Sequence, residues 1–379
     1  MNSWLHLWLG LTSGLIVLVV SLTGTLFVFC DETIEALAGN ARYVQATNSP
    51  RLSSEQLISA FKQQYPDRKP FYFEVYKDPN KSFKIASGDK EQSNFTYTWL
   101  NPYTGKVQGV SSSYWFFYVV AHLHSQLLLH ETGRIVVGIA TIIFFFQLIS
   151  GLVLWWPVNA NALSQRVKFL WKKTTKWKRK NYDLHNVLGF YSLLPAILIT
   201  VTGLIMAYEV LGNLTQTVFG GSTDAHEQEK KLTPKYEKDL RFMSYDQIID
   251  HQLQSGDNVK IVRLSIPRKD SVTTLYCVAA EKVGLKSWVN GQAGAVNRYT
   301  GEFVKFPKDL QKHEQIETLN FDLHVGYWYG LPSKIFTFMV GLICTSLPIT
   351  GFFIWWGRRK KEKKGVQTTS SKTFIPNKI

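Results

Sequence analysis

The sequence predicts an α-helical membrane protein with four transmembrane helices in two tandem parallel repeats, each repeat carrying an extracytoplasmic α+β domain. Three features lead to this fold class: long apolar stretches, basic segments beside them, and motif spacings that recur in both halves of the 379 residues. The apolar stretches cover residues 4–29, 135–156, 187–207 and 335–356. Each has about 20 or more residues, which at about 1.5 Å per residue is enough to cross a hydrocarbon core of roughly 30 Å. They exclude a purely soluble protein.

The charge of the chain is concentrated beside these stretches. The sequence holds 43 Lys and Arg against 28 Asp and Glu, a net charge of +15. Residues 157–183 and 357–379 each contain eight basic residues and one acidic residue, so nearly all of the excess lies in these two segments. Short basic segments beside apolar stretches are typical of cytoplasmic loops. Both termini are therefore predicted to be cytoplasmic, with residues 30–125 and 210–330 outside, and the charge requires no nucleic-acid partner.

The two halves of the chain share the same motif spacings. Each half begins with a histidine followed after 17 residues by a Thr-Gly pair, and continues with a second histidine followed after 27 residues by glycine. The matched residues are His6 with His185, Thr23-Gly24 with Thr202-Gly203, His124 with His324, Ser150-Gly151 with Thr350-Gly351, and Trp155-Trp156 with Trp355-Trp356. Parallel repeats of this kind predict a pseudo-two-fold axis along the membrane normal.

Nine segments follow one another in this prediction. They are transmembrane helix 1 (1–30), extracytoplasmic domain 1 (31–114), an interfacial helix (115–132), transmembrane helix 2 (133–157), a basic cytoplasmic loop (158–183), transmembrane helix 3 (184–210), extracytoplasmic domain 2 (211–322), an interfacial segment with transmembrane helix 4 (323–356), and a basic cytoplasmic tail (357–379). The first is expected to be a retained helix, because neither a preceding basic residue nor a small-residue cleavage site marks it as a signal peptide. Gly133 and Pro332 are predicted to break the helices that follow His124 and His324, since residues 124–155 as one helix would measure roughly 46 Å.

The outer segments have the patterns of α+β domains. In the first, Ser53 is the predicted cap of a helix that ends before Pro66, and alternating apolar residues predict strands at 71–76, 82–86 and 97–100. In the second, the corresponding elements are a helix at 245–253 and strands at 259–266, 274–280 and 288–289. Cys30, Cys277 and Cys344 lack metal-ligand spacing. A Cys30–Cys277 disulfide is one alternative, and buried inert thiols are the favoured one.

The duplicated histidines are the candidate functional residues. A pseudo-two-fold axis brings His6 and His185 together near the cytoplasmic face, and His124 and His324 together near the outer face. Two facing imidazoles suit the two axial positions of a haem iron, so two haems, one at each face, would form an electron path across the membrane. The alternative is that each histidine is interfacial and hydrogen-bonds to backbone or headgroups. His122 and His130 remain open as replacements for His124, and Gly10, Gly14, Gly189 and Gly203 either leave room for a macrocycle or serve helix packing.

These residues resemble a known family. The chain resembles PepSY-associated transmembrane proteins, which are also described as iron-regulated proteins of the bacterial inner membrane. Three features carry the resemblance: the Leu-His-x-x-Leu-Gly motifs that begin two spans at His6 and His185, the Leu-His…Gly…Trp-Trp pattern of the other two spans, and the outer domain that ends in Asn101-Pro102-Tyr103-Thr104-Gly105. Members include ferrisiderophore reductases with b-type haem. The resemblance therefore implies PepSY-like outer domains and reduction of Fe(III) in siderophores on the periplasmic side.

Two functions follow as expectations. The first is a ferric-chelate reductase of the bacterial inner membrane with two b-type haems, whose electrons come from an unidentified cytoplasmic or membrane donor and whose axial ligands are His6, His185, His124 and His324. The partner is a ferric siderophore or another ferric chelate. The alternative is a non-enzymatic PepSY module anchored in the lipid bilayer that binds or regulates a periplasmic protein such as a peptidase. A transporter is disfavoured, because no span carries a charged residue at mid-depth.

Overall fold

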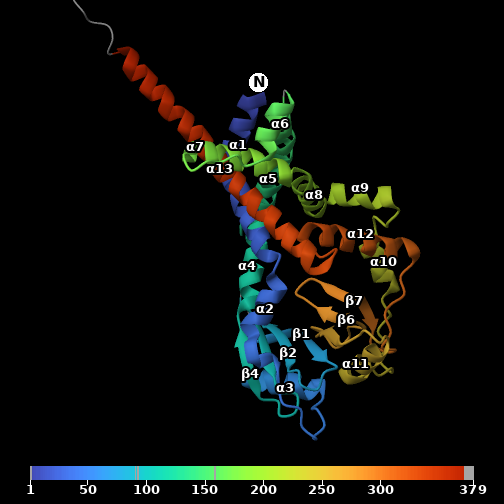
Figure 1. Ribbon diagram of the computed structural model, residues 1–379. Helices are drawn as coiled ribbons and strands as arrows, with labels where there is room; N and C mark the ends of the chain where they lie inside the picture. The colour runs from blue at the N-terminus through green and yellow to red at the C-terminus, as the bar shows by residue number, and fades with distance from the viewer. Residues whose placement is uncertain (1, 90, 92–93, 158, 371–379) are drawn as a thin grey trace, which may run out of the picture. The chain divides into compact units, whose positions relative to one another are not determined.

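The computed structural model describes residues 2–89, 91, 94–157 and 159–370 and divides into two compact units. The helical unit consists of Met1–Val28, Val120–Thr215 and Glu317–Ile379, and the sheet unit consists of Phe29–Val119 and Gln216–Ile316. Both units are therefore assembled from segments of both halves of the chain (Figure 1). Of the predicted basic tail, residues 371–379 lie outside the described part.

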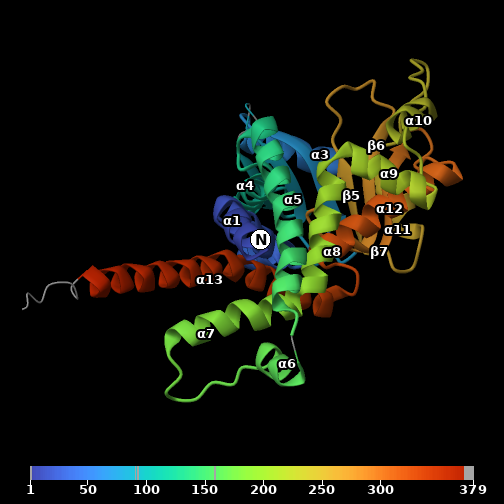
Figure 2. The same cartoon turned by 90° about the horizontal axis from the view of Figure 1, so that it is seen from above.

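Four apolar helices form the helical unit, as the sequence predicts. They are α1 (Asn2–Phe27), α5 (His130–Trp155), α8 (Gly189–Ala207) and α13 (Gly330–Ser370). By length and composition, Ser3–Phe27, His130–Trp155, Trp177–Ala207 and Gly330–Arg359 can each cross a membrane. Going round the bundle in space, α1 packs on α5, α5 on α8, α8 on α13 and α13 on α1 (Figure 2). The first helices of the two halves, α1 and α8, therefore lie diagonally opposite each other.

Two helices carry the second histidine of each half, separately from the apolar helices that follow. They are α4 (Ser113–Gln126) and α12 (Lys308–Val325). The prediction of separate helices is confirmed, but the predicted break points are wrong. The first break is at Leu127 and Leu128, which have positive φ angles, whereas Gly133 lies inside α5. The second is between Gly326 and Gly330, both with positive φ, and Pro332 lies in the first turn of α13, where the missing N–H costs nothing.

The sheet unit contains one antiparallel sheet of seven strands, in the order β4-β3-β2-β1-β5-β6-β7. The strands are β1 (Lys69–Tyr76), β2 (Phe83–Gly88), β3 (Phe95–Leu100), β4 (Val107–Ser111), β5 (Ile261–Ser265), β6 (Thr274–Val283) and β7 (Trp288–Asn297). The prediction of two separate α+β domains is thus corrected. The first strand of each half pairs with the other, with Phe73 opposite Leu264, so both segments belong to one sheet.

One face of this sheet packs on two helices, α3 (Ser54–Gln64) and α11 (Tyr245–Gln254). Each helix begins with a complete capping box, from Ser53 and from Ser244. The two helix starts also bind each other: the N–H of Ser54 donates to Asp246, and the N–H of Tyr245 donates to Glu55. Because side chains alternate along a strand, every second residue points to the opposite face, which carries the charged residues described below.

The remaining helices are short and connect these parts. They are α2 (Cys30–Ala38), η1 (Gly39–Arg42), α6 (Ala160–Val167), α7 (Trp177–Asp183), η2 (Leu184–Leu188), α9 (Glu209–Phe219) and α10 (Ala225–Leu232). η2 is a π-helical turn, a feature that occurs most often at functional sites, and it contains His185. Cys30, Cys277 and Cys344 are buried and are not joined by a disulfide, which confirms the favoured prediction of buried thiols.

Candidate functional site

The structure brings His6 and His185 together. His6 lies in the second turn of α1 and His185 lies in the π-helical turn before α8, and their ring centroids are 6.5 Å apart with the ring planes 83° from parallel. The sequence predicts this meeting from the duplicated spacing alone. Both rings are partly buried within the helical unit.

A hydroxyl group fixes each of these two rings. His6 Nδ1 lies 3.0 Å from Ser150 Oγ, and His185 Nδ1 lies 2.9 Å from Thr350 Oγ1. Both hydroxyls donate their own proton to a backbone carbonyl of their helix, at Gln147 and Ser346 respectively. The hydroxyl oxygens therefore accept from Nδ1–H, which leaves Nε2 as the nitrogen with the free lone pair. We refer to His6 and His185 as the hydroxyl-anchored pair.

The second pair, His124 and His324, is held by backbone carbonyls. The ring centroids are 5.9 Å apart and the ring planes are 59° from parallel. His124 Nδ1 lies 2.8 Å from the carbonyl oxygen of Val20, and His324 Nδ1 lies 2.9 Å from that of Ile199. A carbonyl only accepts, so Nδ1 carries the proton here too and Nε2 is again the nitrogen with the free lone pair. We refer to these two residues as the carbonyl-anchored pair.

Burial keeps the carbonyl-anchored pair neutral. Removal from water lowers the pKa of His124, although its hydrogen bond to Val20 opposes the shift. For His324, burial and the neighbouring His124 lower the pKa to about 4. Near neutral pH both imidazoles are therefore uncharged, which is the form that binds a metal ion.

Each of the four imidazoles lies against a glycine. A Cβ atom at Gly24 would lie 2.8 Å from Cε1 of His124, and one at Gly203 would lie 2.9 Å from Cε1 of His324. In the hydroxyl-anchored pair the corresponding distances are 3.4 Å at Gly151, to His6, and 3.3 Å at Gly351, to His185. Real Cβ contacts are essentially never shorter than 3.0 Å. The glycines of the carbonyl-anchored pair are thus required for the rings to lie where they do.

The two pairs lie at opposite ends of the four-helix bundle. His6 is near the beginning of α1, whereas Gly24, against which His124 packs, is near its end. Eighteen residues of helix at about 1.5 Å each separate the two levels by roughly 27 Å, which is close to the thickness of a hydrocarbon core. The hydroxyl-anchored pair therefore lies at one end of the apolar region and the carbonyl-anchored pair at the other.

The donor set of each pair fits the axial positions of a haem. A haem iron needs only two protein ligands because the macrocycle supplies the others, and each pair offers two imidazoles. A metal ion bound by both Nε2 atoms, at about 2.0 Å each, requires ring centroids roughly 6 Å apart. The observed separations of 6.5 and 5.9 Å meet that requirement. Gly24 and Gly203 let the rings of His124 and His324 lie at this separation, because a Cβ at either position would meet Cε1 of the ring. The donor set of the residues present therefore fits the group.

Comparison with protein families matches residues 3–358 to the model of the PepSY-associated TM region. The chain belongs to the PepSY-associated transmembrane family. It is therefore a membrane protein whose spans and sheet unit both lie within the family match, and the predicted membership is confirmed. No curated protein matches this PepSY-associated protein.

The structure also bears on two alternatives that the sequence left open: whether His122 or His130 replaces His124, and whether the glycines lie beside the site or serve helix packing. His130 begins α5 and is exposed, and His122 is partly buried, whereas it is the ring of His124 that lies beside that of His324. Gly10 and Gly189 face Gln147 and Leu347 of neighbouring helices, which is the packing role, as Gly14 does towards Pro348. Only Gly203 of the four predicted glycines lies against an imidazole.

Five positions of the candidate site were missing from the sequence prediction. They are the hydroxyl anchors Ser150 and Thr350 and the glycines Gly24, Gly151 and Gly351. The signal was present, because all five belong to the Ser-Gly and Thr-Gly motifs by which the two halves were aligned. In both halves a glycine follows a hydroxyl residue at the same sequence spacing from a duplicated histidine. That pattern indicates an imidazole ring that is both hydrogen-bonded and closely packed.

Proposed function

We propose that this protein is a haem-containing electron-transfer protein that reduces Fe(III) in siderophores or other ferric chelates on the periplasmic side of the bacterial inner membrane. The observation that carries the proposal is the pair of imidazoles at each end of the apolar bundle, each with Nδ1 held by an anchor. Two such sites are what electron transfer across the membrane requires.

The residues of the chain have defined tasks in this proposal. When bound, a b-type haem at each pair supplies a one-electron Fe(III)/Fe(II) couple. Ser150 and Thr350 hold the rings of His6 and His185 in one tautomer, and the carbonyls of Val20 and Ile199 do the same for His124 and His324. Such outer contacts fix ring orientation and raise the basicity of a metal ligand. The apolar walls of the bundle exclude water from the rings.

The direction of transfer follows from the charge distribution. The basic segments 157–183 and 357–379 favour a cytoplasmic location for both termini and for the hydroxyl-anchored pair. A cytoplasmic or membrane reductant gives up one electron at that end, and one Fe(III) in a chelate at the periplasmic end becomes Fe(II). Hard oxygen-donor chelators bind Fe(II) less tightly, so the iron is released.

The decisive experiment is an absorption spectrum of the detergent-purified protein, oxidised and then reduced with dithionite, with a pyridine haemochrome assay. The expected result is a Soret band that sharpens on reduction, about two haems per chain, and reoxidation by a ferric chelate. A colourless protein from cells with ample haem overturns the proposal. It leaves the anchored PepSY module that binds a periplasmic protein as the better account.

A further inference from the structure

A cavity of about 540 Å³ lies inside the sheet unit, on the face of the sheet opposite α3 and α11. Its volume falls within the range of roughly 300–1,000 Å³ that is typical of small-molecule sites. Residues of α2 and η1 form one wall, and the loop between β1 and β2, the strands β2 and β3, and the loop between β6 and β7 form the others. Both halves of the chain thus contribute to one cavity.

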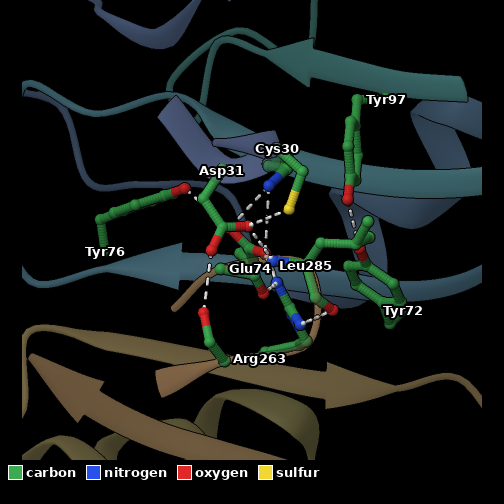
Figure 3. Close-up of polar contacts among 11 residues, drawn as sticks. Cys30, Asp31, Tyr72, Glu74, Tyr76, Tyr97, Arg263 and Leu285 are labelled. Carbon is green, nitrogen blue, oxygen red and sulfur yellow. Dashed lines mark hydrogen bonds and ion pairs between the residues drawn. The ribbon is translucent and has the colours of Figure 1, made fainter. Parts of the chain in front are cut away.

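The wall of the cavity contains a buried lysine from a charged row across the sheet. Lys84, Glu74 and Arg263 lie directly opposite one another on β2, β1 and β5. Lys84 Nζ is 3.2 Å from Glu74, and Arg263 donates to the same carboxylate at 2.6 Å. Figure 3 shows Glu74 and Arg263 meeting close to Asp31 of α2, whose carboxylate accepts from the N–H of Leu285 at 2.6 Å.

The Glu74 carboxylate pairs with both Lys84 and Arg263, but the two cations differ in their number of other hydrogen-bond acceptors. Arg263 also donates to the carbonyls of Gly284 and Leu285, whereas Lys84 has only Glu74 as its hydrogen-bond acceptor among the described residues. Burial raises the pKa of Glu74, but Lys84 and Arg263 outweigh it and lower the value to about 2. Burial lowers the pKa of Lys84, and Glu74 and Asp31 oppose that shift. The ammonium group on the cavity wall therefore shares the Glu74 carboxylate with Arg263 and lies 4.1 Å from the ring centroid of Tyr97.

The mouth of the cavity adds two further cations. Lys77 and Lys81 line it, and within the described residues neither has a carboxylate within ion-pair distance. The other basic residues of the mouth are paired, Arg42 with Glu35 at 3.2 Å and Lys260 with Glu281 at 2.7 Å. Two further acidic residues line the cavity: Asp78 accepts from the N–H of Asn80, and Asp31 accepts from the N–H of Leu285. The lining thus has five basic residues against four acidic ones. Basic groups are therefore in excess around the opening.

Aromatic rings line the rest of the cavity. Tyr97 and Trp99 of β3 and Tyr76 of β1 lie along it, and Tyr43 lies at the mouth under Lys81, whose Nζ is 3.9 Å from the ring centroid. Tyr97 and Trp99 are almost fully buried, so the sheet holds them rigidly. Rigid rings beside spare ammonium groups suit a compact ligand that has anionic oxygens and a flat or apolar body.

We propose that this cavity binds the ferric chelate, and that it selects chelates with anionic oxygen donors, which lie towards Lys77, Lys81 and Lys84 while the apolar part lies against Tyr97 and Trp99. The proposal rests on the proposed function for its substrate class. The inference adds to the proposed function the binding site of the chelate and a preference for anionic chelates.

Gallium(III) separates binding from reduction, because it forms complexes like those of Fe(III) but does not accept an electron. The probe is the gallium(III) complex of a tricatecholate, which is anionic, compared with that of a trihydroxamate, which is neutral, and binding to the full-length protein in detergent is measured by calorimetry. The test variant is Lys77→Gln/Lys81→Gln. The matched control is Lys62→Gln/Lys106→Gln, which removes two exposed lysines that do not line the cavity.

The expected result is that the test variant binds the tricatecholate complex at least about tenfold more weakly, with little change for the trihydroxamate and none in the control. Lys84→Met, which leaves Glu74 paired with Arg263, is expected to weaken binding further. Unchanged binding in both variants overturns the inference, and so does an absence of binding by the wild type.

The two proposals fail in different ways. His324→Ala is expected to abolish ferric-chelate reduction while the gallium complex still binds as in the wild type. A colourless protein that binds the gallium complex through Lys77 and Lys81 supports the cavity and overturns only the proposed function. A haem protein that reduces ferric chelates with the same KM in the wild type and in Lys77→Gln/Lys81→Gln overturns only the cavity.

Discussion

The hydroxyl-anchored and the carbonyl-anchored histidine pairs follow one plan but differ in what holds the rings. In the first pair the nearest partners of Nδ1 are the side chains of Ser150 and Thr350, which a single substitution can remove, although His185 also has a backbone contact with Leu347. In the second pair they are the backbone carbonyls of Val20 and Ile199, which no substitution can remove. The hydrogen bonds that orient the first pair can therefore be changed by substitution, whereas those of the second pair are set by the backbone of the neighbouring helices.

The glycines differ in the same sense. Against the carbonyl-anchored rings, a Cβ would approach to 2.8 and 2.9 Å, which requires movement. Against the hydroxyl-anchored rings, it would approach only to 3.4 and 3.3 Å, which a small adjustment relieves. The carbonyl-anchored pair is thus more tightly constrained in both its hydrogen bonds and its packing, and changes there are expected to have larger effects.

Removal of one ligand has the largest expected effect. His185→Ala and His324→Ala should each reduce the haem content from about two per chain to about one, because each removes one axial ligand of a different pair. Both should abolish electron transfer to a ferric chelate, since either break interrupts the path. The measurement is the pyridine haemochrome count together with the rate of reoxidation. His226→Ala, at an exposed site in the sheet unit, is the control. Two haems in both variants would contradict the assignment of ligands.

Substitution of the glycines tests the difference in packing directly. Gly24→Ala and Gly203→Ala should displace the imidazoles of His124 and His324 and release the haem of that pair. Gly151→Ala and Gly351→Ala should leave the haem count unchanged and alter only the line shape of the spectrum. Alanine is favoured over glycine in a helix by about 1 kcal/mol, so a loss cannot come from helix propensity. Equal haem loss in all four variants would show that the distances do not control occupancy.

Acid should act on the carbonyl-anchored pair through His324. Its pKa is about 4 in the folded protein against an ordinary value of 6.5, so between these pH values the unfolded chain binds a proton that the folded chain does not. Stability is therefore fully present above pH 6.5 and falls as the pH is lowered towards 4. Thermal unfolding of the haem-free protein in detergent across this range checks the sign, and His324→Gln should flatten the dependence. A melting temperature that rises on acidification would be the opposite result.

The four spans and the pairing of the histidines could be predicted because both are encoded along the chain. Each span is one uninterrupted apolar stretch, and the duplicated spacing places His6 opposite His185 without any knowledge of packing. The helix break before α5 could not be predicted in the same way. Gly133 is the residue with the greatest backbone freedom, yet the turn is made at Leu127 and Leu128 in the left-handed region, and Gly133 is needed inside α5 because a Cβ would meet the carbonyl of Gln126.

The single sheet was not predictable from local patterns, because the choice of strand partner is a long-range property. Alternation shows that β1 and β5 are strands but not that they pair across 189 residues. The charged row of Lys84, Glu74 and Arg263 was missed for the same reason. Each of the three is an isolated charge within an apolar strand, and only the register of β2, β1 and β5 brings them together.

Removal of a hydroxyl anchor has the smallest expected effect, and it separates the two pairs most finely. Ser150→Ala removes the hydroxyl beside His6, and Thr350→Val removes the hydroxyl beside His185, which keeps its backbone contact with Leu347. Loss of such an outer contact typically weakens metal binding by roughly tenfold or more. The expected outcome is faster haem loss to apomyoglobin and a shifted midpoint potential for one of the two haems. Thr202→Val is the matched control in the other pair. Its hydroxyl lies 3.1 Å from His324 Nδ1, but the carbonyl of Ile199 lies closer, at 2.9 Å, and remains as the acceptor. The Thr202 variant should therefore keep both potentials. A shift in this variant as large as that in Thr350→Val would mean that the carbonyl does not hold the ring, and that the two pairs are anchored in the same way.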